Sequence, residues 1–171
     1  MLHLRAYFGD QFPLSEVERL GGIKEARYRE LVRTKGVELL PGVARYLAKM
    51  KADGWRQALA SSASLLNIET ILDAMKIAER FDAIVSAEDV QNGKPDPEVF
   101  LVAAQRVSTL PARCVVIEDS PAGLEGAGRA GMRTIGVQSS HNRLQADVVV
   151  GTLEELPHDA FDRLVPKHGS A

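Results

Sequence analysis

The sequence predicts an α/β fold in which helices cover both faces of a parallel, doubly wound sheet. Short apolar runs alternate with longer amphipathic segments from residue 39 onward, which is typical of parallel strands joined by right-handed helical crossovers. Two of these runs, 57–60 and 114–117, end directly in polar residues, as strands do at the ligand-binding edge of such a sheet. With 171 residues, the chain is long enough for one domain with a substantial core.

The first 36 residues have a helical pattern and precede every predicted strand. Ser15 and Glu18 have the spacing of a capping box, and Gly21-Gly22 is expected to interrupt the helix that follows. A second helix is expected over 24–33. We therefore expect a small helical piece appended to the sheet. A pair of surface helices with no role in function is an equally open interpretation.

The remainder of the chain is expected to carry the sheet. Val43, Leu47 and Met50 have helical spacing, and Gly54 follows as a helix stop. The expected helices cover 43–53, 67–75, 98–107 and 123–131, the expected strands cover 57–60, 83–85, 114–117, 134–137 and 147–150, and a short amphipathic tail covers 153–165.

The composition excludes several classes of protein. The net charge is −2, the isoelectric point is about 6.1, and no basic patch indicates nucleic-acid binding. No signal-peptide pattern opens the chain and no apolar run approaches membrane-spanning length, so we expect a cytoplasmic protein with no membrane partner. The single cysteine, Cys114, lies in an apolar run and is expected to be a buried structural thiol. The four histidines have no metal-ligand spacing and are expected at the surface or in packing.

Glu118 and Asp119 directly follow the apolar run 114–117. Two adjacent carboxylates at a strand tip suit a hard divalent cation such as Mg²⁺. Two solvated acids that precede a helix N-cap are the alternative interpretation of this stretch on its own.

Ser61 directly follows the buried run 57–60. Its hydroxyl, together with the backbone N–H groups of Ser62 and Ala63, could hold a phosphoryl oxygen at a helix N-terminus. A helix cap is the alternative role of this serine, and it is favoured when the serine is considered alone.

Lys94 stands between Gly93 and Pro95, which restrict the backbone, so its ammonium group is presented from a stiff loop. A lysine at the carboxyl edge of the sheet can neutralise a phosphate and a nearby carboxylate. An ordinary solvated lysine is an equally open interpretation. A cation, a lysine and a hydroxyl around one phosphate are the parts that phosphoryl transfer needs.

Three segments carry a family resemblance: Ala60-Ser61-Ser62, Gly93-Lys94-Pro95-Asp96-Pro97-Glu98-Val99-Phe100 and Val116-Ile117-Glu118-Asp119-Ser120-Pro121-Ala122-Gly123. In this order they resemble motifs two, three and four of the haloacid dehalogenase superfamily, in its beta-phosphoglucomutase-like phosphatase subgroup. The resemblance extends from residue 24 to residue 150. It implies a Rossmann-like α/β core over 39–171 and part of the family's helical cap over 1–38.

The resemblance also implies roles for individual residues. Ser61 would hold the phosphoryl oxygens, and Lys94 would bridge the phosphate and the nucleophile. Glu118 and Asp119 would hold Mg²⁺. Lys24 lies where some relatives place a cap lysine that touches substrate. The implied function is a Mg²⁺-dependent phosphatase or phosphomutase that acts on a small phosphorylated metabolite, with a sugar phosphate as the expected substrate.

The sequence departs from the family at its start. Family members begin with a strand that ends in Asp-x-Asp, whose first aspartate takes the phosphoryl group, and no two of the ten aspartates in this chain have that spacing. The chain alone is therefore expected to lack full activity. Three explanations stay open: a start at an internal methionine, which we favour because the other motif residues remain, a natural inactive remnant, or assembly with a separate piece.

The absent strand also affects the expected sheet. In the family it lies between the strands that match Leu59 and Val116, so without it both strands have buried N–H and C=O groups that lack partners, which is costly. We expect the chain to pair these two strands with each other, to borrow a strand from a partner chain, or to be marginally stable. Two strands separated by an empty slot, with no strand of a partner chain in it, would contradict this argument.

Other functions are considered beside the phosphatase. A non-catalytic binding or interaction module that keeps the phosphate and cation pocket is the alternative. A dehalogenase proper is disfavoured because dehalogenases of this fold need no cation. Gly126, Gly128 and Gly131 have the spacing of a dinucleotide-binding motif, but they lie inside a predicted helix rather than at a strand-to-helix turn, so close helix–sheet packing explains them better.

Overall fold

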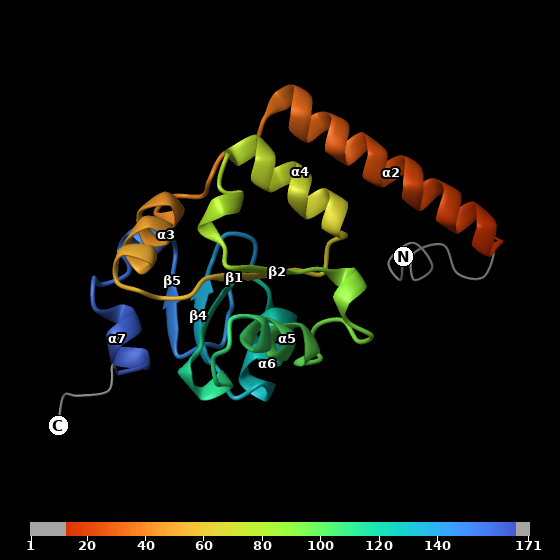
Figure 1. Ribbon diagram of the computed structural model, residues 1–171. Coiled ribbons are helices and arrows are strands. Elements are labelled where there is room, and N and C mark those ends of the chain that lie inside the picture. The colour runs from red at the N-terminus through yellow and green to blue at the C-terminus, as the bar shows by residue number, and fades with distance from the viewer. Residues whose placement is uncertain (1–12, 167–171) are drawn as a thin grey trace.

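The computed structural model describes residues 13–166 as alternating helices and strands (Figure 1). The α-helices are α2 (Leu14–Lys35), α3 (Val43–Ala52), α4 (Leu65–Met75), α5 (Glu98–Arg106), α6 (Pro121–Arg129) and α7 (Ala160–Leu164), and the strands are β1 (Ala58–Ala60), β2 (Ala83–Val85), β3 (Val115–Glu118), β4 (Arg133–Val137) and β5 (Val148–Val150). The predicted strands and core helices are confirmed to within two residues at each end. Within the described range, no helix is both long and apolar enough to cross a membrane.

All strand pairs are parallel, but the strands form two separate sheets. β1 pairs with β2, and β4 lies between β3 and β5. Over residues 13–166, no strand joins the two sheets. Pairing of the strands of Leu59 and Val116 with each other, one of the three expected outcomes, is therefore wrong. A strand from a partner chain and marginal stability stay predictions.

The free edge of β1 lies on the side away from β2. The Ser61 N–H donates to the Val85 carbonyl oxygen, 2.9 Å away. Because alternate residues of a strand direct their backbone groups to opposite sides, the N–H and C=O of Ala60 face away from β2. The Ala60 carbonyl oxygen lies 3.4 Å from Lys94 Nζ, which donates to it. A lysine side chain thus contacts the backbone acceptor at the free edge of β1.

The free edge of β3 lies on the side away from β4. The Arg133 N–H donates to the Cys114 carbonyl oxygen, 3.0 Å away, so the backbone groups of Val115 and Ile117 point away from β4. Ile117 is 41% exposed although it lies in the third position of its strand. Within residues 13–166, no strand pairs with this outer edge of β3.

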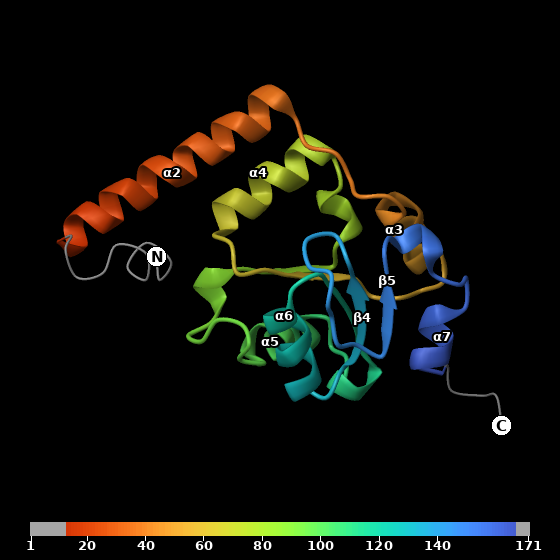
Figure 2. The ribbon, with the colours of Figure 1, turned by 180° about the vertical axis from the view of Figure 1, so that it is seen from behind.

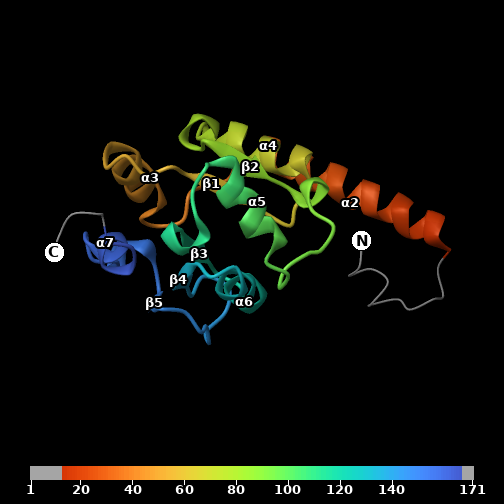
Figure 3. The ribbon, with the colours of Figure 1, turned by 60° about the horizontal axis from the view of Figure 1, so that its bottom comes forward.

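Helices pack on both faces of the strands. α5 and α6 lie side by side, and α5 contacts β1 and β2 while α6 contacts β3 and β4 (Figures 2 and 3). Their shared core contains Val85, Val99, Phe100, Ala103, Ala104, Ala127, Ala130 and Met132. A second core joins α3 and α7 to β4 and β5 and is centred on Tyr46, Met50, Ile135 and Phe161. The doubly wound arrangement is confirmed, and α5 and α6 bridge the two sheets.

The N-terminal helices differ from the prediction. Residues 14–35 form one continuous helix, α2, which includes Gly21 and Gly22. Ser15 lies inside this helix, and its N-cap residue is Pro13, without a side-chain capping bond. Paired glycines cost helix stability, by about 1 kcal/mol each relative to alanine, but they remove no backbone hydrogen bond. The helical pattern on both sides therefore continues through them.

Candidate active site

Lys94 and Glu118 form a shielded ion pair where β1 and β3 end. Lys94 Nζ lies 2.7 Å from Glu118 Oε1 and 3.4 Å from the Ala60 carbonyl oxygen. The two charged side chains are only 14% and 12% exposed. The ammonium group also lies 5.0 Å from the centre of the Phe100 ring. The interpretation of Lys94 as an ordinary surface lysine is therefore wrong: it connects the carboxyl ends of strands from both sheets.

The first turn of α6 holds the Glu118 carboxylate. Ser120 Oγ accepts from the Gly123 N–H at 3.0 Å as the N-cap of α6, and it donates to Glu118 Oε1 at 3.2 Å. Glu118 Oε2 accepts from the Asp119 N–H at 2.8 Å. A Cβ atom on Gly123 would lie 1.9 Å from Glu118 Oε1. Glycine at this position is what lets the carboxylate fold over the helix N-terminus.

Close packing of α6 explains a second glycine. A Cβ atom on Gly126 would lie 3.2 Å from the carbonyl oxygens of Pro95 and Asp96 and from the Phe100 ring. The predicted reason for the glycines, close packing of this helix, thus holds at Gly126. A Cβ atom on Gly128 would meet nothing within 4 Å.

Hydroxyl groups from the loop after β4 hold the Asp119 carboxylate. Ser139 Oγ and Ser140 Oγ both donate to Asp119 Oδ2, at 3.0 and 2.8 Å. His141 Nδ1 lies 2.9 Å from Ser140 Oγ and 3.1 Å from the Asp119 carbonyl oxygen. Burial raises the pKa of Asp119, but the hydrogen bonds from Ser140 and Ser139 outweigh it and hold the pKa below its usual value. The carboxyl group is therefore ionised at neutral pH.

Sequence reasoning missed Ser139, Ser140 and His141 as part of this site. His141 is exposed, as expected, but its ring nitrogen contacts the loop that carries Asp119. One signal was available: these residues follow β4, which pairs with β3, so both segments end at the same edge of the sheet.

Ser61, Ser62 and Ala63 follow β1 at the same carboxyl edge. Ser61 Oγ accepts from the Ala63 N–H at 3.1 Å. The helix α4 begins later, and its N-cap position is occupied by Ser64. Ser61 is therefore not the cap of α4, and its hydroxyl stabilises a turn beside Ala60, the residue that Lys94 contacts. Its role in phosphate binding stays a prediction.

Lys24 lies apart from the ion pair of Lys94. It is on α2, its side chain is 68% exposed, and its ammonium group lies 2.6 Å from Glu25 Oε1. Glu25 in turn accepts from Asn67 of α4, and Arg29 donates to Asn67 Oδ1 at 2.9 Å. These bonds fasten α2 to α4. A substrate contact by Lys24 stays a prediction.

The donor set at the end of β3 fits a divalent cation in part. The carboxylates of Glu118 and Asp119 are the hard oxygen ligands that Mg²⁺ prefers. Over residues 13–166, however, no group of three or more His, Cys, Asp or Glu side chains is placed to hold a metal. Glu118 Oε1 is also engaged by Lys94. These two residues can supply part of a Mg²⁺ site, and water or groups outside the described residues must complete it.

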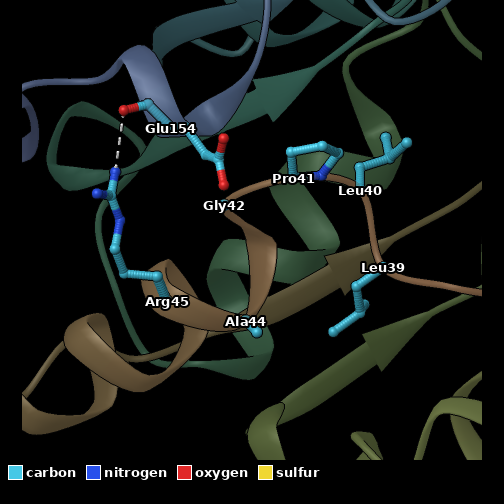
Figure 4. Close-up of a pocket in the computed structure, with 7 residues that line it drawn as sticks. All are labelled: Leu39, Leu40, Pro41, Gly42, Ala44, Arg45 and Glu154. Atoms are coloured by element: carbon cyan, nitrogen blue, oxygen red, sulfur yellow. Dashed lines mark hydrogen bonds between the residues drawn. The ribbon is translucent and has the colours of Figure 1, made fainter.

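Two surface cavities lie away from this cluster. One, of about 400 Å³, is lined by Leu39, Leu40, Pro41, Gly42, Ala44, Arg45 and Glu154 (Figure 4). In it, the Arg45 guanidinium donates to the backbone carbonyl oxygen of Glu154 at 3.3 Å. The other, of about 440 Å³, lies between α2 and α4. Neither is lined by Lys94, Glu118 or Asp119.

Comparison with known proteins gives a consistent result. The sequence profile of the haloacid dehalogenase-like hydrolase family matches residues 2–137. Beta-phosphoglucomutase of Bacillus subtilis is 36% identical over 143 residues, which cover 83% of this chain and 62% of that protein. Hexitol phosphatase B of Escherichia coli is 37% identical over 123 residues, which cover 69% of this chain and 55% of that protein.

The fold is also found in solved structures. The crystal structure of beta-phosphoglucomutase from Clostridium difficile superposes with a TM-score of 0.82 at 28% identity and covers 91% of this chain and 69% of that one. The chain spans about three fifths of the length of the two curated relatives, beta-phosphoglucomutase and hexitol phosphatase B. The profile match over most of the sequence, together with these relatives, shows that the chain belongs to the haloacid dehalogenase-like hydrolase family, in its beta-phosphoglucomutase-like subgroup.

Proposed function

We propose that this chain carries the phosphate- and cation-binding part of a Mg²⁺-dependent phosphatase or phosphomutase that acts on a small sugar phosphate. One observation carries the proposal: Lys94, Glu118 and Asp119 lie together where β1 and β3 end. The names of two relatives, a phosphoglucomutase and a hexitol phosphatase, support a sugar phosphate as the substrate class. A cytoplasmic location stays a prediction.

The residues around the ion pair have distinct proposed roles. Ser61 Oγ already accepts from the Ala63 N–H, so its own proton is left to donate to a phosphoryl oxygen. The Ser62 N–H would add a second donor, and the Ala63 N–H a third if it leaves Ser61. Lys94 would neutralise phosphate charge while it orients Glu118. Lys24, on α2, would contact the rest of the substrate.

Glu118 and Asp119 would hold Mg²⁺. When bound, the ion supplies charge neutralisation at the phosphoryl oxygens, which is most of what phosphoryl transfer requires of its site. The shielded position of Lys94 and Glu118 strengthens their electrostatic effect because little water screens it.

The nucleophile is proposed to come from outside the described residues. The sequence contains no Asp-x-Asp pair, and the backbone groups of Ala60, Val115 and Ile117 that face away from their own sheets offer an extended segment two strand edges to pair with. An aspartate at the end of such a segment would attack the phosphorus atom and form an aspartyl phosphate as the P–O bond to the alcohol breaks, and the second aspartate of an Asp-x-Asp pair would give its proton to the leaving oxygen. Water or a second hydroxyl would then take the phosphoryl group. The segment can belong to a longer form of this chain or to a partner chain.

A non-catalytic phosphate- and cation-binding module is the second candidate. The absence of Asp-x-Asp from the sequence is the observation that favours it. The two candidates predict the same ligands and differ only in turnover.

The test compares this chain with the longest reading frame that contains it. Inorganic phosphate with Mg²⁺ should shift the ¹H–¹⁵N resonances of Ser62 and Lys94 in the 171-residue chain, without hydrolysis of p-nitrophenyl phosphate. The longer protein should hydrolyse or isomerise members of a sugar-phosphate panel, and Lys94→Ala should abolish this while Arg129→Ala should not.

Three results would revise the proposal. Phosphate binding without turnover by the longer protein would favour the binding module. Efficient Mg²⁺-dependent turnover by the 171-residue chain would contradict the missing nucleophile. The lack of both phosphate binding and turnover would refute the proposed site.

A further inference from the structure

We propose that the loop 139–141 positions the Asp119 carboxylate for its cation: Ser139 and Ser140 hold one carboxylate oxygen and thereby set the direction of the other. The inference rests on the proposed role of Asp119 as a Mg²⁺ ligand. Both hydroxyl bonds end on Oδ2, at 3.0 and 2.8 Å. Two donors on one oxygen fix the rotation of the carboxylate and therefore fix where Oδ1 points.

The hydrogen-bond directions in this loop follow from the chemistry of the partners. The Asp119 carbonyl oxygen can only accept, so His141 Nδ1, 3.1 Å away, must carry the proton. The same N–H also faces Ser140 Oγ at 2.9 Å, and that oxygen then acts as an acceptor. The Ser140 proton is left for Asp119 Oδ2. His141 thus orients the hydroxyl that orients the carboxylate.

The sheet register brings this loop to Asp119. Gly136 of β4 lies opposite Glu118 of β3, so the residues that follow each strand emerge side by side. The Ser139 N–H donates to the Val137 carbonyl oxygen at 2.8 Å, which folds the loop back at once after β4. This short, folded connection therefore places the hydroxyl groups of Ser139 and Ser140 beside Asp119.

Loss of these bonds should weaken cation binding rather than strengthen it. Groups that hydrogen-bond to a metal ligand keep it in the binding orientation, and their removal typically costs 10–100-fold in metal affinity. The opposite outcome is physically reasonable if the hydroxyls instead compete with the cation for the carboxylate. The sign of the change therefore decides between positioning and competition.

The test is a Mg²⁺ titration of the ¹⁵N-labelled 171-residue chain, followed through the amide resonances of Asp119 and Ser120. It needs no substrate and no turnover, and it measures dissociation constants in the millimolar range. We expect the double variant Ser139→Ala/Ser140→Ala to bind Mg²⁺ about tenfold more weakly than the unmodified chain. Ser140→Thr keeps a hydroxyl at this position. With Ser139 unchanged, this variant should bind Mg²⁺ nearly as tightly as the unmodified chain.

Asn142→Ala is the matched control. Asn142 lies in the same exposed loop but contributes its backbone carbonyl, which accepts from Gln138 at 2.7 Å, so its side chain should not matter. Unchanged or tighter Mg²⁺ binding in the double variant would overturn the positioning role and leave the proposed function standing. A lack of Mg²⁺ binding by both the unmodified 171-residue chain and the longest reading frame that contains it would overturn both, because Asp119 would then not be a cation ligand here.

Discussion

Gly123 is the residue at which space decides the geometry of the site. The Glu118 carboxylate lies where a side chain at position 123 would begin, with Oε1 only 1.9 Å from the Cβ position. We expect Gly123→Ala to push Glu118 away from Lys94 and to lower the free energy of unfolding by about 1–3 kcal/mol, the usual cost of overpacking. Urea unfolding measures this.

The same helix supplies the control for this substitution. Gly128 is exposed and has nothing within 4 Å of its Cβ position. Gly128→Ala should be neutral or stabilising by up to about 1 kcal/mol, because alanine favours helix more than glycine does. Equal destabilisation by both substitutions would show that helix propensity, not the Glu118 contact, explains the glycine at 123.

Lys94 should matter for stability as well as for function. The Glu118 side chain is only 12% exposed, and removal of Lys94 leaves its carboxylate without an ammonium partner. Breaking a shielded pair by removing one partner is strongly destabilising, so we expect Lys94→Met to cost about 3 kcal/mol in urea unfolding. Lys94→Met/Glu118→Gln should recover part of this loss because no uncompensated charge remains.

An exposed ion pair on α6 provides the comparison. Arg129 and Glu125 are 55% and 52% exposed, and pairs of this kind contribute at most about 1 kcal/mol. Arg129→Met should therefore change stability far less than Lys94→Met. A similar small effect for both variants would mean that water screens the Lys94–Glu118 pair in solution.

At the scale of elements, Asp147 ties β5 to β4. Its Oδ2 accepts from the Thr134 N–H at 2.7 Å and from Thr134 Oγ1 at 3.0 Å, and its Oδ1 accepts from Arg133 at 3.2 Å. Burial raises the pKa of Asp147, but the bonds from Thr134 and Arg133 outweigh it, so the pKa lies below its usual value. A carboxyl group with a lowered pKa in the folded state stabilises that state when it is ionised.

The pH dependence of this stabilisation can be tested. It is fully present above the pKa of the unfolded chain, about 3.9, and it is lost as the pH falls through the lower folded-state value. Asp147→Asn should therefore destabilise the protein at pH 7, and its difference from the unmodified chain should shrink below about pH 4. Urea unfolding across this range measures it, with Asp159→Asn, in an exposed pair with Arg163, as the control. A pH-independent difference would contradict the role of the ionised carboxylate.

At the scale of the whole molecule, the two sheets should be visible in backbone amide exchange. The N–H groups of Ala60 and Ile117 face away from their own sheets, whereas Val85 and Ile135 are fully buried within theirs. We expect the amides of Ala60 and Ile117 to exchange more than about tenfold faster than those of Val85 and Ile135 in hydrogen-exchange NMR. Slow exchange at all four positions would show that another strand pairs with these edges in solution.

The sequence by itself determined the order of helices and strands, the parallel α/β class and the loops that carry Ser61, Lys94, Glu118 and Asp119. Apolar runs and turn residues are local signals, so they locate elements well. These local signals predicted a break at Gly21-Gly22, but the structure has one continuous helix there. Glycine weakens a helix without removing its hydrogen bonds, so the helix continues. The resemblance to the family, carried by three ordered motifs, is confirmed by the profile match.

Only the tertiary structure decided which of these parts meet. It separated β1 from β3 into two sheets, and it placed the Lys94 ammonium group beside the Ala60 carbonyl at the end of β1. It also brought Ser139, Ser140 and His141 to Asp119, about twenty residues away along the chain. Contacts of this kind depend on strand register and on the space around single atoms, and neither is written in the local pattern of a sequence.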